Sequence, residues 1–257
     1  MQSISGAIQN YVWGSLDDIA RILGIPQTDE PQAEYWLGAH ASNPSVVDDK
    51  KLDDLLAAHP EMIGAASVER FGDRLPYLLK VLAAARPLSL QAHPTREQAE
   101  IGFARENAAG VAMDDPRRTY RDDWPKPELM LAITTFDALC GFRETSLTAE
   151  LFERFEIGAL SQMVAPLRLR GGSAGLAEVF LDALSQSDEH KDLVIEVVAR
   201  AGEHVEDEGD FGDLCRTAVM LDEFYPGDPS ILAALMMNHI TMQPGESVYL
   251  PAGNLHA

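Results

Sequence analysis

The sequence predicts an α+β protein in which a β-structure is interrupted by a helical insertion. Short segments of alternating apolar and polar residues, separated by turns, occupy residues 1–145 and return in residues 236–257. Residues 146–235 are instead rich in Ala, Leu and Glu, with apolar residues recurring about every 3.6 positions. We therefore expect three parts: an N-terminal β-rich part, a helical subdomain, and the return strands of the same β-structure.

The first elements are short. Ser15 is predicted to cap a helix over residues 16–23, with Asp18 three residues further on, and residues 49–58 show a second helical pattern. Residues 77–82 are mostly apolar, which is typical of a largely buried strand.

A strand over residues 88–93 is predicted from its alternation, which places Ser89, Gln91 and His93 on one face. Pro94 ends this strand. Thr95 then caps a helix, with Gln98 at the reciprocal position of a capping box. Residues 129–133 and 136–142 are predicted to form the next two strands.

Within the helical subdomain, the clearest helical patterns cover residues 176–184, 192–201 and 211–220. Gly171-Gly172 and residues 206–210 are predicted breaks between helices. Strands return at residues 239–242 and 247–250, joined by a turn that contains Pro244 and Gly245. A second turn over residues 251–254 leads to a new strand where the chain stops.

The composition is that of an ordinary globular protein with an acidic surface. The formal net charge is -21 over 257 residues, which argues against nucleic acid as a partner. The sequence has no apolar run long enough to span a bilayer and no N-terminal signal pattern, so no membrane association is expected. Cys140 and Cys215 fit no metal or redox spacing, so we expect reduced thiols and a cytoplasmic location. The sequence does not set the oligomeric state, and we expect a monomer.

Four polar residues in three places form a candidate metal site: Gln91, His93, Glu128 and His256. Gln91 and His93 are two apart on one strand, so their side chains point to the same side with Cα atoms about 6–7 Å apart. Imidazole nitrogens and a carboxylate oxygen suit a cation such as zinc, and three or four protein ligands leave room for water or substrate.

Each of these residues also has a simpler explanation. A single His on a strand is more often a hydrogen-bonded structural residue than a ligand. Lys126-Pro127-Glu128 is most simply a loop with a surface ion pair. His40 and His239 are further candidates on the same footing, whereas three histidines in polar helical contexts are expected to be exposed: His59, His190 and His204.

Two specific motifs lie in order on either side of the helical subdomain. They are Gln-Ala-His-Pro at residues 91–94 and Pro-Ala-Gly-Asn-Leu-His-Ala at residues 251–257. Further motifs lie at residues 11–14, 34–42, 79–82, 87–90, 126–128 and 243–246. In these motifs the sequence resembles the type I phosphomannose isomerases, the zinc-dependent mannose-6-phosphate isomerases of the cupin superfamily. The resemblance covers most of the chain outside the helical subdomain.

The resemblance implies a cupin-type β-barrel, or jelly roll, that carries the helical insertion. It implies one zinc ion per chain, bound by Gln91, His93, Glu128 and His256, so that residues 1–145 and 236–257 together supply the ligands. The implied reaction interconverts mannose 6-phosphate and fructose 6-phosphate, with a sugar phosphate as the small-molecule partner.

The resemblance also places Ser89 and Lys126 along the substrate pocket and Trp13 at its wall. Aldose–ketose isomerisation needs a Lewis acid or oxyanion stabiliser and a base for the carbon-bound proton. Lys126 would either stabilise developing negative charge or hold the phosphate, and we take Lys126 and Ser89 as the candidate catalytic residues. Core packing is the competing role for Trp13, and for His40 a pocket role and a loop-tying role stay open.

The family's usual base candidates and its C-terminal β-domain lie beyond the residue that matches His256. We therefore expect the chain to be a shortened piece of an active enzyme, although a natural short form stays open. Because chain ends fray, His256 is expected to be poorly held, and zinc binding is expected to be weaker than in a full-length enzyme. Because the segment with the base candidates is missing, little or no turnover is expected of this chain.

Two other functions stay open. One is a non-catalytic cupin that binds a metal or a sugar phosphate. The other is a different metal cupin, such as a dioxygenase, which is disfavoured because a ligand set with Gln and two His differs from the sets suited to iron and oxygen chemistry.

Overall fold

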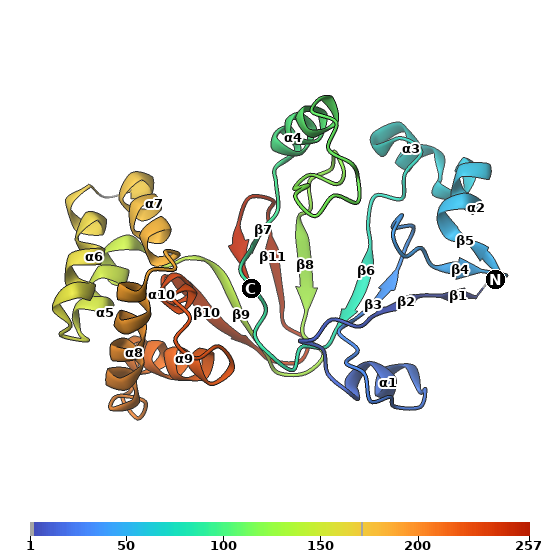
Figure 1. Cartoon of the computed structure of the whole chain (residues 1–257). Helices are drawn as coiled ribbons and strands as arrows, with labels where there is room; N and C mark the ends of the chain where they lie inside the picture. The colour runs from blue at the N-terminus through green and yellow to red at the C-terminus, as the bar shows by residue number, and fades with distance from the viewer. Residues whose placement is uncertain (1–2, 171) are drawn as a thin grey trace. The chain divides into compact units, whose positions relative to one another are not determined.

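The computed structural model describes residues 3–170 and 172–257. The chain divides after Leu88 into two compact units, residues 1–88 and 89–257 (Figure 1). The helical insertion lies within the second unit, between strands β9 and β10. The three-part division expected from the sequence stays a prediction.

Two small antiparallel sheets form the β-structure of the first unit. One has the order β2-β3-β6, made by Ala7–Gln9, Glu34–Leu37 and Leu79–Leu82. The other has the order β1-β4-β5, made by Ile4–Ser5, Val46–Val47 and Lys50–Lys51. Helices α1 (Asp18–Leu23), α2 (Leu52–Ala58) and α3 (Ala65–Phe71) and a 3₁₀ turn (Pro60–Ile63) complete the unit, with Val47, Leu52 and Leu56 as a small buried cluster.

Both helices predicted in this unit are present, but each begins later than expected. Helix α1 begins at Asp18, and the Ser15 hydroxyl still accepts the Asp18 N–H at 3.2 Å. Helix α2 begins at Leu52 because Lys50–Lys51 pairs with β4 as a strand.

The predicted burial of residues 77–82 is wrong. The strand begins at Leu79, and the side chains of Tyr77 and Leu79 are 65% and 56% exposed. The physical reason is that too little packs on the faces of β6: none of residues 77–82 belongs to a buried cluster of the described residues, so their side chains stay partly open to solvent.

In the second unit, two antiparallel sheets pack against each other. The larger has the order β10-β9-β12-β7, formed by Met237–Met242, Phe136–Phe142, Leu255–His256 and Gln91–Ala92. The smaller pairs β11 (Ser247–Leu250) with β8 (Glu128–Leu131). Ala132, Ala138 and Met242 form a buried cluster to which both sheets contribute, Met130 and Val248 from one and Ile240 from the other.

Most strands of this unit lie where the sequence predicts them. Strands β9 and β11 match the predicted ranges, and β8 begins one residue earlier, at Glu128. The strand expected over residues 88–93 shrinks to Gln91–Ala92, the two residues that pair with β12. Helix α4 (Arg96–Ala108) follows with the expected capping box between Thr95 and Gln98.

The helical insertion consists of helices that bury their own core. They are α5 (Thr145–Glu153), α6 (Gly158–Leu169), α7 (Gly172–Ala183), α8 (Asp188–Gly202), α9 (Asp210–Phe224) and α10 (Ser230–Leu235). Phe152, Phe155 and Phe211 are among its largest fully buried side chains, and Figure 1 shows the helices grouped beside β9 and β10.

The three helical patterns predicted in this region are confirmed as α7, α8 and α9. Of the predicted break at residues 206–210, residues 206–209 lie between α8 and α9, and Asp210 begins α9. Of the predicted Gly171-Gly172 break, Gly171 lies outside the described residues and Gly172 begins α7.

The end of the chain is held by strand pairing. His256 pairs with Gln91 of β7 on one side and with Cys140 of β9 on the other. Ala257 and Leu139 exchange backbone hydrogen bonds of 3.0 and 2.7 Å. The expectation that His256 is poorly held is therefore wrong in this structure, because β12 is inserted between two strands rather than placed at an edge.

The α+β class with a helical insertion is confirmed by these elements. Over the part of the chain that the structure describes, none of the helices has both the length and the apolar character needed to cross a membrane.

Replacing Glu144 with Gln is expected to destabilise the protein in a pH-dependent way. The Glu144 carboxylate caps α5 by accepting the Leu147 N–H at 3.0 Å and a hydroxyl hydrogen bond from Ser146. These bonds lower the pKa of Glu144 to about 2. Because the pKa is lowered by folding, the stabilisation is complete above the unfolded-state value of about 4.3 and is lost as the pH falls through the folded-state value.

Urea unfolding followed by circular dichroism would check this, with Glu150→Gln on the same helix as the control. The free energy of unfolding of the Glu144 variant should fall below that of the wild type by the largest amount near pH 7. This difference should become smaller below about pH 4.3. A loss of stability that has the same size at every pH, or that the Glu150 control also shows, would contradict the capping role of the Glu144 carboxylate.

Candidate metal centre

Three side chains of the second unit converge at one place. His93, Glu128 and His256 each offer one ligand atom, and these atoms lie within 4.8 Å of one another. The Nε2 atom of His93 is 3.4 Å from one carboxylate oxygen of Glu128, and the Nε2 atom of His256 is 3.2 Å from the other. Their side chains are 25%, 41% and 12% exposed respectively, so the group is partly shielded from solvent but open to it.

Each of the three comes from a different strand region. His93 directly follows β7, Glu128 is the first residue of β8, and His256 ends β12. Pairing of β12 with β7 sets the two histidines side by side, with ring centroids 5.3 Å apart.

The turn before His256 is tied to the other histidine. The Gly253 N–H donates to the His93 carbonyl oxygen at 2.7 Å. Gly253 has a φ of 93°, a backbone conformation that glycine adopts without the steric penalty of a Cβ. The Pro-Ala-Gly-Asn sequence therefore acts as a turn that delivers His256 to the side of His93.

A backbone carbonyl fixes which nitrogen of His256 faces the group. The Nδ1 atom lies 3.0 Å from the Asn254 carbonyl oxygen, which can only accept a hydrogen bond. Nδ1 must therefore carry the hydrogen, and in the neutral ring Nε2 then has a lone pair directed toward Glu128. An outer hydrogen bond of this kind commonly orients a metal-ligating histidine.

The electrostatics of the three side chains are strongly coupled. Hydrogen bonds from His256 first, and then from His93, hold the pKa of Glu128 well below its usual range despite partial burial. In return, the hydrogen bond to Glu128 raises the pKa of His256, and the Asn254 carbonyl adds to this effect. The carboxylate is thus negative at any pH near neutrality, and positive charge beside it is favoured.

The donor set fits a zinc ion, and the three ligand groups lie close together. Donor atoms about 2.0–2.1 Å from one Zn²⁺ at tetrahedral angles lie about 3.3–3.4 Å from one another. The two histidine nitrogens lie 3.4 and 3.2 Å from different oxygens of Glu128. One ligand atom from each of the three residues lies within 4.8 Å of the others, so the three groups are close enough to bind one ion after small adjustments. Two imidazoles and a carboxylate are also ligands that zinc accepts.

Gln91 lies next to this group on β7. It is the direct cross-strand partner of His256, and partners in an antiparallel pair project to the same face of the sheet with Cβ atoms about 4.5–5.5 Å apart. The half-buried Gln91 side chain therefore lies on the His256 side of the sheet, within reach as a further donor.

Three residues are predicted to line the substrate pocket, and each has a defined place in the structure. Lys126 lies two residues before Glu128 and forms an ion pair with Asp122, its Nζ atom 2.8 Å from both carboxylate oxygens. Ser89 is exposed two residues before Gln91. Trp13 belongs to the first unit, where it stacks on Tyr11 with ring centroids 5.6 Å apart.

The other histidines lie outside this group. His40 ties a loop, because its Nδ1 atom lies 2.8 Å from the Ser42 hydroxyl and the ring contacts the edge of Trp36. His239 bridges Asp137 and Thr217 at 3.2 and 3.4 Å. His190 is only 15% exposed because it pairs with Asp182, so the expectation that it is exposed is wrong, whereas His59 is 54% exposed as expected.

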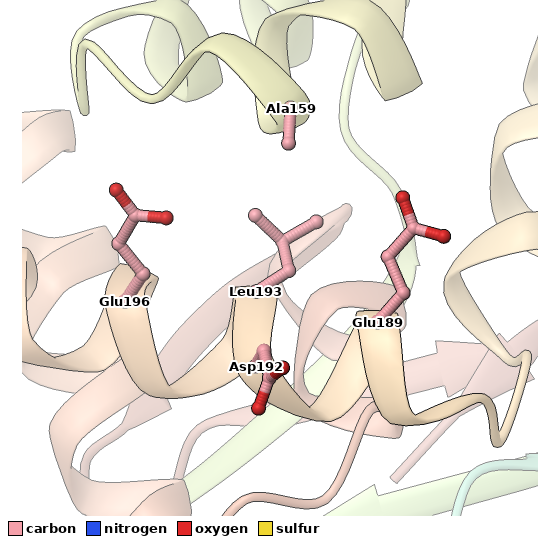
Figure 2. A pocket seen from close by; sticks show the side chains of 5 residues that line it. All are labelled: Ala159, Glu189, Asp192, Leu193 and Glu196. Carbon is pink, nitrogen blue, oxygen red and sulfur yellow. The ribbon is translucent and has the colours of Figure 1, made fainter.

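A separate surface hollow of about 420 Å³ lies between α6 and α8 (Figure 2). Glu189, Asp192 and Glu196 of α8 line it together with Leu193 and Ala159. Figure 2 shows the two glutamates on either side of Leu193. Its polar groups are carboxylates spaced along one helix, so it lacks the mixed nitrogen and oxygen donors of the His93 group.

The sequence does not predict two features in and beside the metal centre. The ion pair of Asp122 with Lys126 has no local signal, because the two residues are four apart in a segment that is not helical. The Asn254 carbonyl that orients His256 is a backbone atom, and only the turn sequence around Gly253 hints at its position.

Comparison with known proteins relates this fold and this site to one family. A model of the phosphomannose isomerase type I catalytic domain matches residues 1–145. The mannose-6-phosphate isomerase of Escherichia coli K12 is 35% identical over 264 residues, which are 100% of this chain and 66% of that protein. The human mannose-6-phosphate isomerase is 30% identical over 284 residues, which are 99% of this chain and 64% of that protein.

Solved structures agree with the sequence relatives. A crystal structure of mannose 6-phosphate isomerase from Salmonella typhimurium, bound to fructose 6-phosphate and zinc, matches with a TM-score of 0.87 and 34% identity. The match covers 100% of this chain and 65% of that one, and it confirms the expected cupin-type α+β fold. This chain thus spans about two thirds, 64–66%, of the length of these relatives. With the catalytic-domain model covering more than half of its residues, the chain belongs to the type I phosphomannose isomerase family.

Proposed function

We propose that the protein is a zinc-dependent aldose–ketose isomerase that interconverts mannose 6-phosphate and fructose 6-phosphate. The observation that carries the proposal is the convergence of His93, Glu128 and His256 in a chain of this family. The names of the relatives, and the fructose 6-phosphate and zinc in the Salmonella structure, support the choice of substrate and metal.

The zinc ligands in this proposal are His93, Glu128, His256 and Gln91. The first three have donor atoms within 4.8 Å of one another, and the amide of Gln91 projects from the strand position opposite His256. When bound, the ion would supply Lewis-acid polarisation of the sugar carbonyl and hydroxyl oxygens.

Lys126 and Ser89 are proposed to contact the substrate and to take part in catalysis. Pro127 favours extended backbone at Lys126. Only Pro127 separates Lys126 from the ligand candidate Glu128, so the two side chains start from neighbouring backbone positions. The Lys126 ammonium is therefore suited to donate to a sugar oxygen beside the metal ligands. Ser89 offers a hydroxyl two residues before Gln91. The role that the resemblance implies for Trp13 stays a prediction.

The cellular setting also stays a proposal. Cys140 and Cys215 are free thiols, which supports a reducing compartment such as the cytoplasm. A monomer remains the prediction for the oligomeric state.

A coupled assay for fructose 6-phosphate formation from mannose 6-phosphate would test the function, together with calorimetric binding of both sugar phosphates. Turnover should disappear when a chelator removes the metal and should return with Zn²⁺. Because little turnover is expected of this chain, binding of both sugar phosphates without detectable turnover fits the isomerase and the non-catalytic cupin alike, and metal-dependent turnover is the result that separates them. Turnover that survives complete metal removal, or a zinc-loaded protein that binds neither sugar phosphate, would overturn the proposal.

Removing any one of the three clustered ligands should weaken zinc binding strongly. We expect His93→Ala, Glu128→Ala and His256→Ala each to lower the affinity by more than the roughly 10–100-fold that loss of an outer-sphere partner causes. Gln91→Ala should cost less, because a neutral amide oxygen is a weaker donor. Competition with a chromophoric chelator measures the affinity, and His59→Ala, an exposed histidine paired with Glu61, is the matched control. A cluster variant that binds zinc like the control would remove that residue from the ligand set.

Zinc affinity should fall as the pH falls, beginning above the usual histidine pKa of about 6.5. The pKa of His256 is raised by Glu128, so this ring keeps its proton to a higher pH and must release it when the metal binds. Without metal, the pair stabilises the fold most between about pH 4.5 and 6.5, above the unfolded-state pKa of Glu128 and below that of His256. Calorimetry in buffers of different ionisation enthalpy should detect proton release near pH 7. Affinity that stays constant across this range would contradict the ligand role of His256.

A further inference from the structure

The ammonium group of Lys126 is engaged before any substrate arrives. Its Nζ atom lies 2.8 Å from both oxygens of the Asp122 carboxylate. An ammonium has three N–H donors and no acceptor, so two donors directed at Asp122 leave one for another partner. The side chains of Lys126 and Asp122 are 42% and 37% exposed, which leaves that donor accessible.

Asp122 is itself held in place. One of its oxygens also accepts the Trp124 N–H at 3.0 Å, which closes a local turn around the carboxylate. The Arg96 guanidinium lies over the Trp124 ring, 4.3 Å from its centroid. Because Arg96 is the first residue of α4, this contact links the Asp122 turn to the helix that follows His93.

The segment that leads into Asp122 is anchored on the same helix. The buried Arg118 guanidinium donates to the carbonyl oxygens of Val111 and Tyr120 and to the Asn107 side chain. The Glu106 carboxylate of α4 accepts backbone N–H groups from the same segment, including that of Tyr120 at 2.8 Å. Asp122 is therefore part of an ordered framework rather than a free surface carboxylate.

We propose that Asp122 is a positioning residue that aims the remaining N–H of Lys126 at an oxygen of the reacting sugar carbons, and not at the phosphate. The inference rests on the proposed isomerase function and deepens it. The Cα atoms of Lys126 and Glu128 are at most about 7 Å apart, since only Pro127 lies between them. A single directed donor at that place suits a carbonyl, hydroxyl or developing oxyanion beside the metal ligands.

Charge explains why the phosphate is the poorer partner. A phosphate dianion that bound the Lys126 ammonium would lie beside a carboxylate whose oxygens are 2.8 Å from the same nitrogen, and like charges repel. A sugar oxygen carries no full charge in the ground state, so it needs only the directed N–H. Asp122 would also offset the repulsion between the ammonium and a nearby metal cation.

The test compares binding of fructose 6-phosphate with binding of inorganic phosphate to the zinc-loaded protein by calorimetry. Asp122→Asn removes the negative charge and should weaken fructose 6-phosphate binding about tenfold, the effect of losing one well-directed charge-assisted hydrogen bond. Inorganic phosphate binding should stay the same or become tighter, because the ammonium is no longer neutralised. Asp122→Glu should recover part of the sugar phosphate affinity, since it restores the carboxylate.

Two controls separate positioning from a general structural effect. Asp114→Asn removes an exposed carboxylate from the segment that leads to Asp122 and should leave both affinities unchanged. Lys126→Met should weaken sugar phosphate binding but leave inorganic phosphate binding unchanged. Where turnover is measurable, Asp122→Asn should also lower kcat more than it raises KM.

The proposal falls if Asp122→Asn matches Asp114→Asn, if both affinities fall together, or if Lys126→Met abolishes inorganic phosphate binding. A wild-type zinc-loaded protein that binds no sugar phosphate would instead overturn the isomerase function, and this proposal with it. Because that outcome appears in the wild type and the others only in variants, the two failures are distinguishable.

Discussion

The pairing of β12 between β7 and β9 is the constraint on which the metal centre depends. This strand is only Leu255–His256, yet it is bonded on both sides, and the turn before it donates from Gly253 to the carbonyl of His93. Without these bonds His256 would be a mobile side chain near the end of the chain. With them, two histidines distant in sequence share one carboxylate, and three groups that zinc accepts as ligands lie within 4.8 Å of one another.

The helical insertion leaves this arrangement undisturbed because it buries its own apolar surface. Phe152, Phe155 and Phe211 pack with other helix residues in one cluster that reaches the sheet through Leu139 and Met237. The chain leaves β9 at Phe142 and returns in β10 at Met237, and these two residues are register partners. The insertion therefore closes on itself, and the sheet continues as though the helices were a long connection between neighbouring strands.

The metal centre favours local positive charge, although the molecule as a whole is strongly acidic. A net charge of -21 repels a sugar phosphate, so recognition depends on local positive charge. The coupling of Glu128 with His256 and His93 favours such charge at the metal position, whether it comes from protons or from a cation. The ammonium of Lys126 is nearby in sequence but is balanced by Asp122, which makes it a directed donor more than a free positive charge.

The sequence by itself determined the features that depend on neighbouring residues: the α+β class, helices α7 to α9, the Thr95–Gln98 capping box and the motifs that carry Gln91, His93, Glu128 and His256. Helix caps, hydrophobic periodicity and turns involve residues only a few positions apart, so they can be predicted from a single sequence. Only the tertiary structure decided that β7 is short, that Leu79 is exposed, that His256 is firmly held and that Asp122 engages Lys126. Strand ends, burial and ion pairs outside helices depend on partners brought together by the fold, and a single sequence does not specify those partners locally.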